Sequence, residues 1–188
     1  TTVPTGQMLG LLSDLSFTQL VNEALRNYQS TLALSRSPLA NSPLVTPTLV
    51  KDEASPTAEE RGHGLRLVLQ WAVNQLAPST PAYPLGVYRP LDDDTWRDPR
   101  WWRYTILRHR YLDPLHPDDF VDGGRYTESL LALTGISGPD AFFDERNRAV
   151  RAVAEQLRQQ LIDGSASASL QQLALQEVIA PLAKKQEA

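Results

Sequence analysis

Cysteine is absent from the sequence, methionine occurs once, and no long uninterrupted run of apolar residues is present. Without cysteine, the chain has no disulfide bonds, no thiolate catalysis and no cysteine-ligated zinc. Because a membrane-spanning helix needs about 20 apolar residues in succession, the sequence predicts none. Residues 1–10 also lack the basic segment of a signal peptide. These absences together predict a cytoplasmic protein that does not bind membranes.

Histidine is scarce as well, and the three histidines, His63, His109 and His116, do not have the spacing of a metal-binding motif. The glycine-rich phosphate loops and the GxSxG motif of hydrolases are missing. The acidic residues 92–94 offer oxygen ligands for a hard cation, but they lack the spacing of a calcium loop. The sequence therefore predicts a protein without enzymatic activity, metal or cofactor.

The overall composition is ordinary for a folded protein. The chain has 188 residues, of which 41% are hydrophobic and 21% are charged, and this length is sufficient for one sizeable core. The net charge of −4 counts against a free-standing nucleic-acid-binding domain, because such domains are usually basic. A local basic face is still compatible with this charge.

Apolar residues that recur every three or four positions predict a mainly helical protein. Such a stripe covers residues 17–28 and is followed by prolines over residues 30–56, which we interpret as a loop that places leucines on the core. A second helix begins at Thr57, which forms a capping box with Glu60. The helix ends before Pro78, since proline cannot continue it.

A third helix begins at Asp98, with Pro99 at its first position, and continues to residues 111–112. Arginines alternate with aromatic residues over residues 96–104. Arginine binds phosphates and tryptophan stacks on bases, so this segment is a candidate nucleic-acid-binding surface. Alternatively, the aromatic side chains pack inward and the arginines are solvated or paired with the acidic residues 92–94.

A helix-turn-helix is predicted in the second half of the chain. Residues 125–133 form a short helix, residues 134–137 a tight turn, and residues 138–162 a long helix. Gly135 is suited to the left-handed conformation that ends a helix, and Ser137 is suited to cap the next one. The predicted buried face of the long helix comprises Phe143, Val150, Val153, Leu157 and Leu161.

These residues resemble the helix-turn-helix of sigma-factor-like regulators, found as helical modules at the N-termini of large bacterial regulatory or signalling proteins. The resemblance rests on residues 103–107, 110–112, 133–137, 142–143 and 146–153, and is weaker over residues 17–40. It implies that the second helix of the unit enters the major groove of DNA and reads bases from its N-terminal turns.

The chain departs from this pattern in two places. The connection over residues 113–128 is longer than usual. The second helix begins with Gly, Pro and Asp at residues 138–140, followed by Asp144 and Glu145, where base-reading helices carry hydrogen-bond donors. These carboxylates repel phosphates, and they stabilise a helix N-terminus without DNA. Two functions stay open: a transcription regulator that binds duplex DNA, and a non-catalytic docking module with a degenerate helix-turn-helix.

Each function predicts its own contact residues. For DNA binding they are the arginines of the third and the long helix, namely Arg100, Arg103, Arg108, Arg146, Arg148 and Arg151. The arginines of the long helix are also close to acidic residues, which is equally typical of a solvated helix face. For partner binding, the expected contacts are Trp101 together with Leu173, Val178 and Leu182 of a C-terminal helix, which folds back on the core or packs on a partner or a second copy.

The resulting fold prediction is all-α: an orthogonal helical bundle with long proline-rich loops and a helix-turn-helix unit at about residues 125–162. We expect residues 1–163 to form a single domain. Residues 164–188 are expected to form a flexible linker and the C-terminal helix, which is capped by Ser169.

Overall fold

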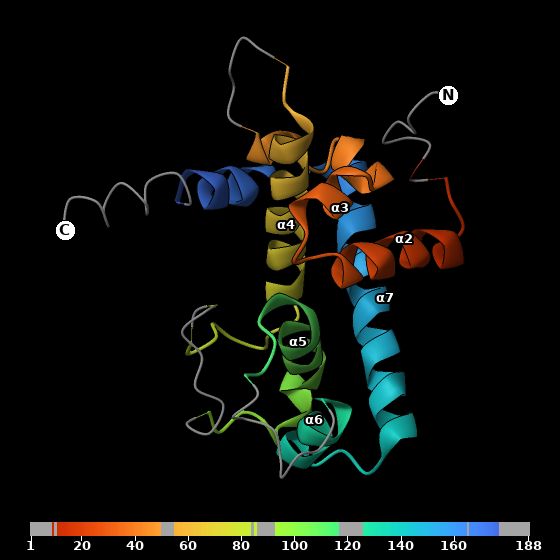
Figure 1. Ribbon diagram of the computed structural model, residues 1–188, viewed down its shortest axis with the longest axis vertical. Helices are drawn as coiled ribbons and strands as arrows, with labels where there is room; N and C mark the ends of the chain where they lie inside the picture. The colour runs from red at the N-terminus through yellow and green to blue at the C-terminus, as the bar shows by residue number, and fades with distance from the viewer. Residues whose placement is uncertain are drawn as a thin grey trace, which may run out of the picture. The chain divides into compact units, whose positions relative to one another are not determined.

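The computed structural model describes residues 9, 11–49, 55–83, 85, 93–116, 126–164 and 166–176. All regular secondary structure in these ranges is helical, which confirms the all-α class (Figure 1). Within the same ranges, no helix has both the length and the apolar character that a membrane span requires. Val178 and Leu182, two of the predicted partner contacts, lie outside the described residues.

The described residues divide into two compact units. The first combines residues of Thr1–Trp71 with residues of Ala154–Ala188, and the second lies within Ala72–Val153. Two long helices, α4 (Ala58–Asn74) and α7 (Pro139–Asp163), therefore contribute residues to both units.

In the first unit, α2 (Asp14–Arg26) and α3 (Thr31–Ser35) precede two short 3-10 helices, η1 (Pro38–Asn41) and η2 (Thr46–Thr48). Oγ of Ser13 caps α2 by accepting a hydrogen bond from the N–H of Ser16. The proline-rich stretch does place apolar residues in the core, namely Leu34, Leu39, Leu44 and Val45. Leu32, from the same stretch, is instead exposed.

The backbone of α4 lies very close to that of α3. A Cβ atom placed on Gly62 would lie 2.3 Å from the carbonyl oxygen of Thr31 and 3.1 Å from the amide nitrogen of Ser35. Glycine lowers the helix propensity of this turn, but the absence of a side chain permits the close approach. The predicted start of α4 is confirmed, since Oγ1 of Thr57 accepts a hydrogen bond from the N–H of Glu60 at 3.1 Å.

The segment predicted as a linker packs on its own chain. Ala166 is buried, and its N–H donates to Oε1 of Gln160 at 2.7 Å. Residues 167–176 are helical. Leu170 is fully buried there, and Leu173, a predicted partner contact, is half-buried. The described part of the C-terminal helix therefore covers an apolar face within the first unit.

A continuous helical segment in the second unit changes its winding twice. It begins as the 3-10 helix η4 (Pro99–Trp101), continues as α5 (Trp102–Leu107) and ends as a π-helical turn, η5 (Arg108–Leu112). The predicted start is confirmed, because Oδ1 of Asp98 accepts a hydrogen bond from the N–H of Arg100 at 3.0 Å.

The second unit also contains α6 (Tyr126–Thr134), which residues 135–138 connect to α7. Gly135 has a φ of 75°, in the left-handed region that favours glycine. Beyond it, Ile136 belongs to the core of this unit, whose buried members are Trp96, Ile106, Leu115, Leu130, Ile136 and Phe142.

The buried face of α7 differs from the predicted one at its first turn. Phe142 is 0% exposed and Phe143 is 38% exposed, so the prediction that Phe143 faces the core is wrong. Val150 and Val153 are buried as expected. The side chain of Phe142 shares the face of the buried Ala149 and Val153, because residues seven and eleven positions apart lie on one face of an α-helix.

Candidate functional site

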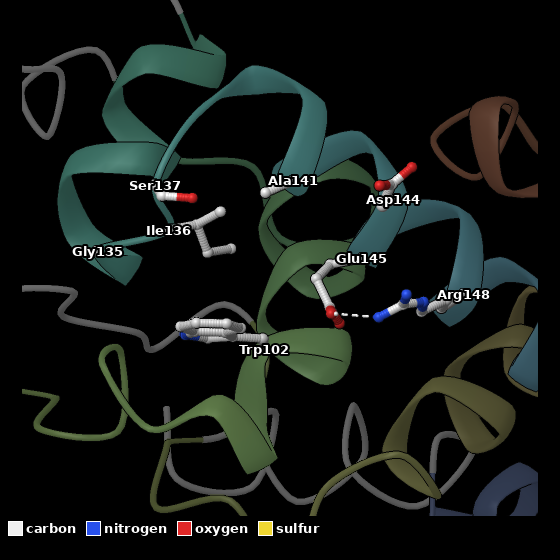
Figure 2. A pocket seen from close by; sticks show the side chains of 8 residues that line it. All are labelled: Trp102, Gly135, Ile136, Ser137, Ala141, Asp144, Glu145 and Arg148. Atoms are coloured by element: carbon white, nitrogen blue, oxygen red, sulfur yellow. Dashed lines mark hydrogen bonds and ion pairs between the residues drawn. The ribbon is translucent and has the colours of Figure 1, made fainter.

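Two adjoining hollows in the surface of the second unit share Trp102 and Glu145 as lining residues. The first has a volume of about 370 Å³, and its other walls are residues 135–137 of the turn and residues of α7, including Arg148 (Figure 2). The second has a volume of about 470 Å³ and lies beside η4 and the start of α5, with Arg103 in its wall. We call the two hollows together the Trp102 groove.

The floor of the Trp102 groove is apolar and firmly held. Trp102 packs against the core cluster that contains Ile136, and its Nε1–H donates to the carbonyl oxygen of Trp96 at 3.2 Å. In Figure 2 the side chain of Ile136 points toward the ring of Trp102. Since packing and a hydrogen bond hold the indole, the groove exposes part of a large aromatic ring in one orientation.

Glu145 links the two charged walls of the groove. Its Oε1 accepts a hydrogen bond from Nη1 of Arg148 at 3.1 Å, and its Oε2 lies 4.0 Å from Nε of Arg103. The side chain of Glu145 is 21% exposed, whereas those of Arg103 and Arg148 are 49% and 57% exposed. Glu145 therefore makes a hydrogen bond to Arg148 and a longer electrostatic contact with Arg103.

Of the six arginines that were predicted to contact DNA, four lie within ion-pair distance of a carboxylate of the same unit, and three of these four are at the surface. Arg103 and Arg148 contact Glu145. Arg100 is 76% exposed, but Asp98 accepts hydrogen bonds from its Nη2 at 2.8 Å and its Nε at 3.2 Å. These hydrogen bonds lower the pKa of Asp98 below its ordinary value. The predicted basic surface is therefore largely neutralised where these residues lie.

The two remaining candidates on α7 are differently placed, and Arg146 is half-buried. The guanidinium carbon of Arg146 lies 5.5 Å from the ring centroid of Phe143, and its Nη2 donates to Oδ1 of Asn147. Arg151 is exposed and does not line the Trp102 groove. No ion pair of Arg151 lies within the described part of the chain.

Arg108 is 2% exposed, so the prediction that it contacts DNA is wrong. Its Nη1 donates to the carbonyl oxygen of Tyr83 and to the hydroxyl of Tyr104, both at 2.8 Å, and its Nη2 lies 3.3 Å from Oδ2 of Asp113. Burial also raises the pKa of Tyr104. The guanidinium therefore connects three segments of the second unit from within.

Trp101 was predicted to contact a partner through an exposed ring, and this prediction is also wrong. Trp101 is 7% exposed and packs edge-on against Tyr104, with ring centroids 5.7 Å apart. Trp102, the next residue, lines the groove instead. The change from 3-10 to α geometry lies between these two residues.

His109 is buried next to Arg108. Its Nδ1 lies 3.1 Å from the carbonyl oxygen of Asp113, and its ring centroid lies 4.9 Å from that of Trp96. Burial lowers the pKa of His109 from 6.5 to about 3, and the positive charge of Arg108 acts in the same direction. His109 is therefore neutral in the folded chain at neutral pH.

Acidification is expected to destabilise the chain through His109. Between a pKa of 6.5 in the unfolded chain and about 3 in the folded one, only the unfolded chain binds the proton. The free energy of unfolding should therefore fall with decreasing pH, by on the order of 2 kcal/mol from pH 6.5 to pH 5. Urea unfolding at several pH values measures this slope. In His109→Gln the slope should be smaller by that amount, and equal slopes in both proteins would contradict the prediction.

The acidic residues 92–94 were considered as a cation site. Oδ1 of Asp93 accepts hydrogen bonds from the N–H and the hydroxyl of Thr95 at 2.8 and 2.7 Å, so this carboxylate closes a turn. Asp92 lies outside the described residues. Within the part of the chain that the structure describes, no group of three histidine, aspartate or glutamate residues is arranged to hold a metal ion.

The sequence indicated only some of the residues that line the Trp102 groove. Arg103 and Arg148 were identified, but as DNA contacts. Glu145 precedes Arg148 by three positions, a spacing that indicates an ion pair on one helix, but its approach to Arg103 of another helix has no local signal. Comparison with known proteins adds no further residues: no family model, no curated protein and no solved structure matches this chain.

Proposed function

We propose that the chain is a non-catalytic protein-docking module whose partner binds in the Trp102 groove. The observation that carries this proposal is the placement of Glu145 between Arg103 and Arg148, beside the apolar floor formed by Trp102. A groove with an exposed aromatic ring, flanked by arginines, is typical of the energetically important part of a protein interface.

Duplex DNA is the less favoured partner, for an electrostatic reason. Affinity for DNA arises mainly from cationic side chains that neutralise phosphates. In this chain, the arginines nearest to the groove are already paired with carboxylates, and Arg108 is buried. The first turns of α7 also present the exposed carboxylates of Asp140 and Asp144, which repel phosphates.

Blocking the groove is expected to weaken partner binding strongly. Ser137 is exposed and lines the first hollow, so the Ser137→Trp variant fills that hollow with a large side chain without disturbing the core. Asn147 is exposed on α7 but does not line either hollow, which makes Asn147→Trp a matched control. As a probe we suggest peptides selected from a phage-displayed random library on the immobilised chain. Ser137→Trp should weaken their binding at least about tenfold, and Asn147→Trp by less than about twofold.

Two outcomes would contradict this proposal. In the first, every selected peptide binds the wild-type chain and both tryptophan variants equally. In the second, random duplex DNA binds at about 50 mM salt, the affinity falls steeply as salt is added, and Arg148→Glu and Arg151→Glu both weaken it. The second outcome would establish the alternative function, since Arg151 does not line the groove.

A further inference from the structure

We infer that the second unit binds one structural water molecule in a small polar cavity beside Tyr104, and that this water connects α5 to the turn at residues 93–95. The inference is independent of the proposed docking function. Three observations carry it: the size of the cavity, the charges in its walls, and the hydrogen-bonding groups of Tyr104, Thr105 and Asp93 that no other described residue satisfies.

The cavity lies within the second unit and is separate from the Trp102 groove, because the two share no lining residue. Buried residues of η4, α5 and η5, among them Tyr104 and Thr105, form one wall. Residues of the segments 81–83 and 93–95 form the other. The volume of the cavity is about 10 Å³, which is close to the space that one water molecule needs and too small for an organic ligand.

The hydroxyl of Tyr104 has a proton to donate at this cavity. Tyr104 is buried, and its hydroxyl accepts a hydrogen bond from Nη1 of Arg108 at 2.8 Å. Burial raises the pKa of Tyr104, so the hydroxyl keeps its proton at neutral pH. Arg108 cannot accept that proton, because a guanidinium group only donates. Among the described residues no other group accepts it, and a buried donor without an acceptor is costly.

Two further polar groups in the walls complete a site for water. Oδ1 of Asp93 accepts both hydrogen bonds from Thr95, whereas Oδ2 of Asp93 has no hydrogen-bond partner in the described ranges. The hydroxyl of Thr105, which is buried on α5, has none there either. A water between these groups can accept from Tyr104, donate to Asp93 and form a third hydrogen bond with Thr105. Buried waters typically make about three hydrogen bonds.

The charges around the cavity favour an uncharged occupant. The guanidinium group of Arg108 lines one wall and repels a small cation. The carboxylate of Asp93 lines the opposite wall and repels a small anion. A water molecule avoids both repulsions, and it can act as donor toward the carboxylate and as acceptor toward the hydroxyl of Tyr104.

A high-resolution crystal structure of the wild-type chain provides the direct test. We expect electron density for one ordered oxygen atom within hydrogen-bonding distance of Oη of Tyr104 and of Oδ2 of Asp93 or Oγ1 of Thr105. A cavity without such density, or a Tyr104 hydroxyl that donates directly to a protein acceptor, would overturn the inference. This test needs no variant, so it is decisive even if a substitution in the cavity prevents folding.

Relaxation dispersion of the oxygen nuclei of isotopically labelled water tests the site in solution, since its amplitude reports long-lived internal waters and is not affected by hydroxyl protons. In Thr105→Ile a larger apolar group replaces the hydroxyl, so the amplitude should fall by about one water molecule. Thr134→Val is the matched control. Thr134 is equally buried, but its hydroxyl donates to the carbonyl oxygen of Leu130 and it does not line the cavity, so the amplitude should not change. Equal amplitudes for the wild-type chain and a folded Thr105→Ile would contradict the inference.

Discussion

The Gly62→Ala variant is expected to be less stable than the wild-type chain by about 3 kcal/mol. A methyl group on this residue would lie 2.3 Å from the carbonyl oxygen of Thr31, whereas real Cβ atoms essentially never approach another heavy atom within 3.0 Å. The clash is with backbone atoms of α3, so it is relieved only if one of the two helices moves. Alanine has a helix propensity about 1 kcal/mol better than glycine, so any loss of stability must come from the clash.

Urea unfolding followed by circular dichroism measures this effect, and Gly138→Ala is the control. A Cβ atom on Gly138 would meet no other atom within 4 Å, and its backbone does not need the left-handed conformation. Alanine should therefore be neutral or slightly stabilising there, since it restricts the unfolded chain. If the two variants unfold at the same urea concentration, the backbones of α3 and α4 are not in contact at Gly62.

The Arg108→Met variant is expected to lose about 3 kcal/mol of stability. Methionine fills similar space, but it removes the hydrogen bonds to the carbonyl oxygen of Tyr83 and the hydroxyl of Tyr104, together with the ion pair to Asp113. Because the site is buried, water does not readily replace these interactions. Chemical unfolding monitored by tryptophan fluorescence provides the measurement.

Arg103→Met provides the comparison, because it removes the same charge from the same helical segment. Arg103 is 49% exposed and its ion pair with Glu145 is 4.0 Å long, so its replacement should change stability by less than about 0.5 kcal/mol. Arg108→Lys keeps the charge without the planar fork and should fall between the two. Equal stabilities for Arg108→Met and Arg103→Met would show that the buried contacts of Arg108 contribute nothing.

Part of the lining of the Trp102 groove could be predicted from the sequence. The alternation of arginine and aromatic residues at residues 96–104 drew attention to a segment that lines the groove, and Arg103 and Arg148, both predicted as binding residues, also line it. The carboxylate that lies between these arginines could not be predicted from the sequence. That carboxylate belongs to α7, and its approach to α5 is a tertiary contact between residues 42 positions apart.

The sequence alone determined where most of the helices begin and end. Thr57 and Asp98 cap their helices as predicted, and the all-α class follows from apolar periodicity. These signals are reliable because caps, prolines and helical periodicity act over only a few neighbouring residues.

The tertiary structure decided which of two neighbouring residues faces the solvent. Trp101 is buried and Trp102 lines the groove, and Phe142 is buried while Phe143 is exposed. It also turned Arg108 inward, although its sequence context resembles that of the exposed Arg103. Successive residues of an α-helix point about 100° apart, so a rotation of the helix by that angle exchanges a buried side chain with its exposed neighbour. That rotation is set by packing against other helices, and local sequence does not encode it.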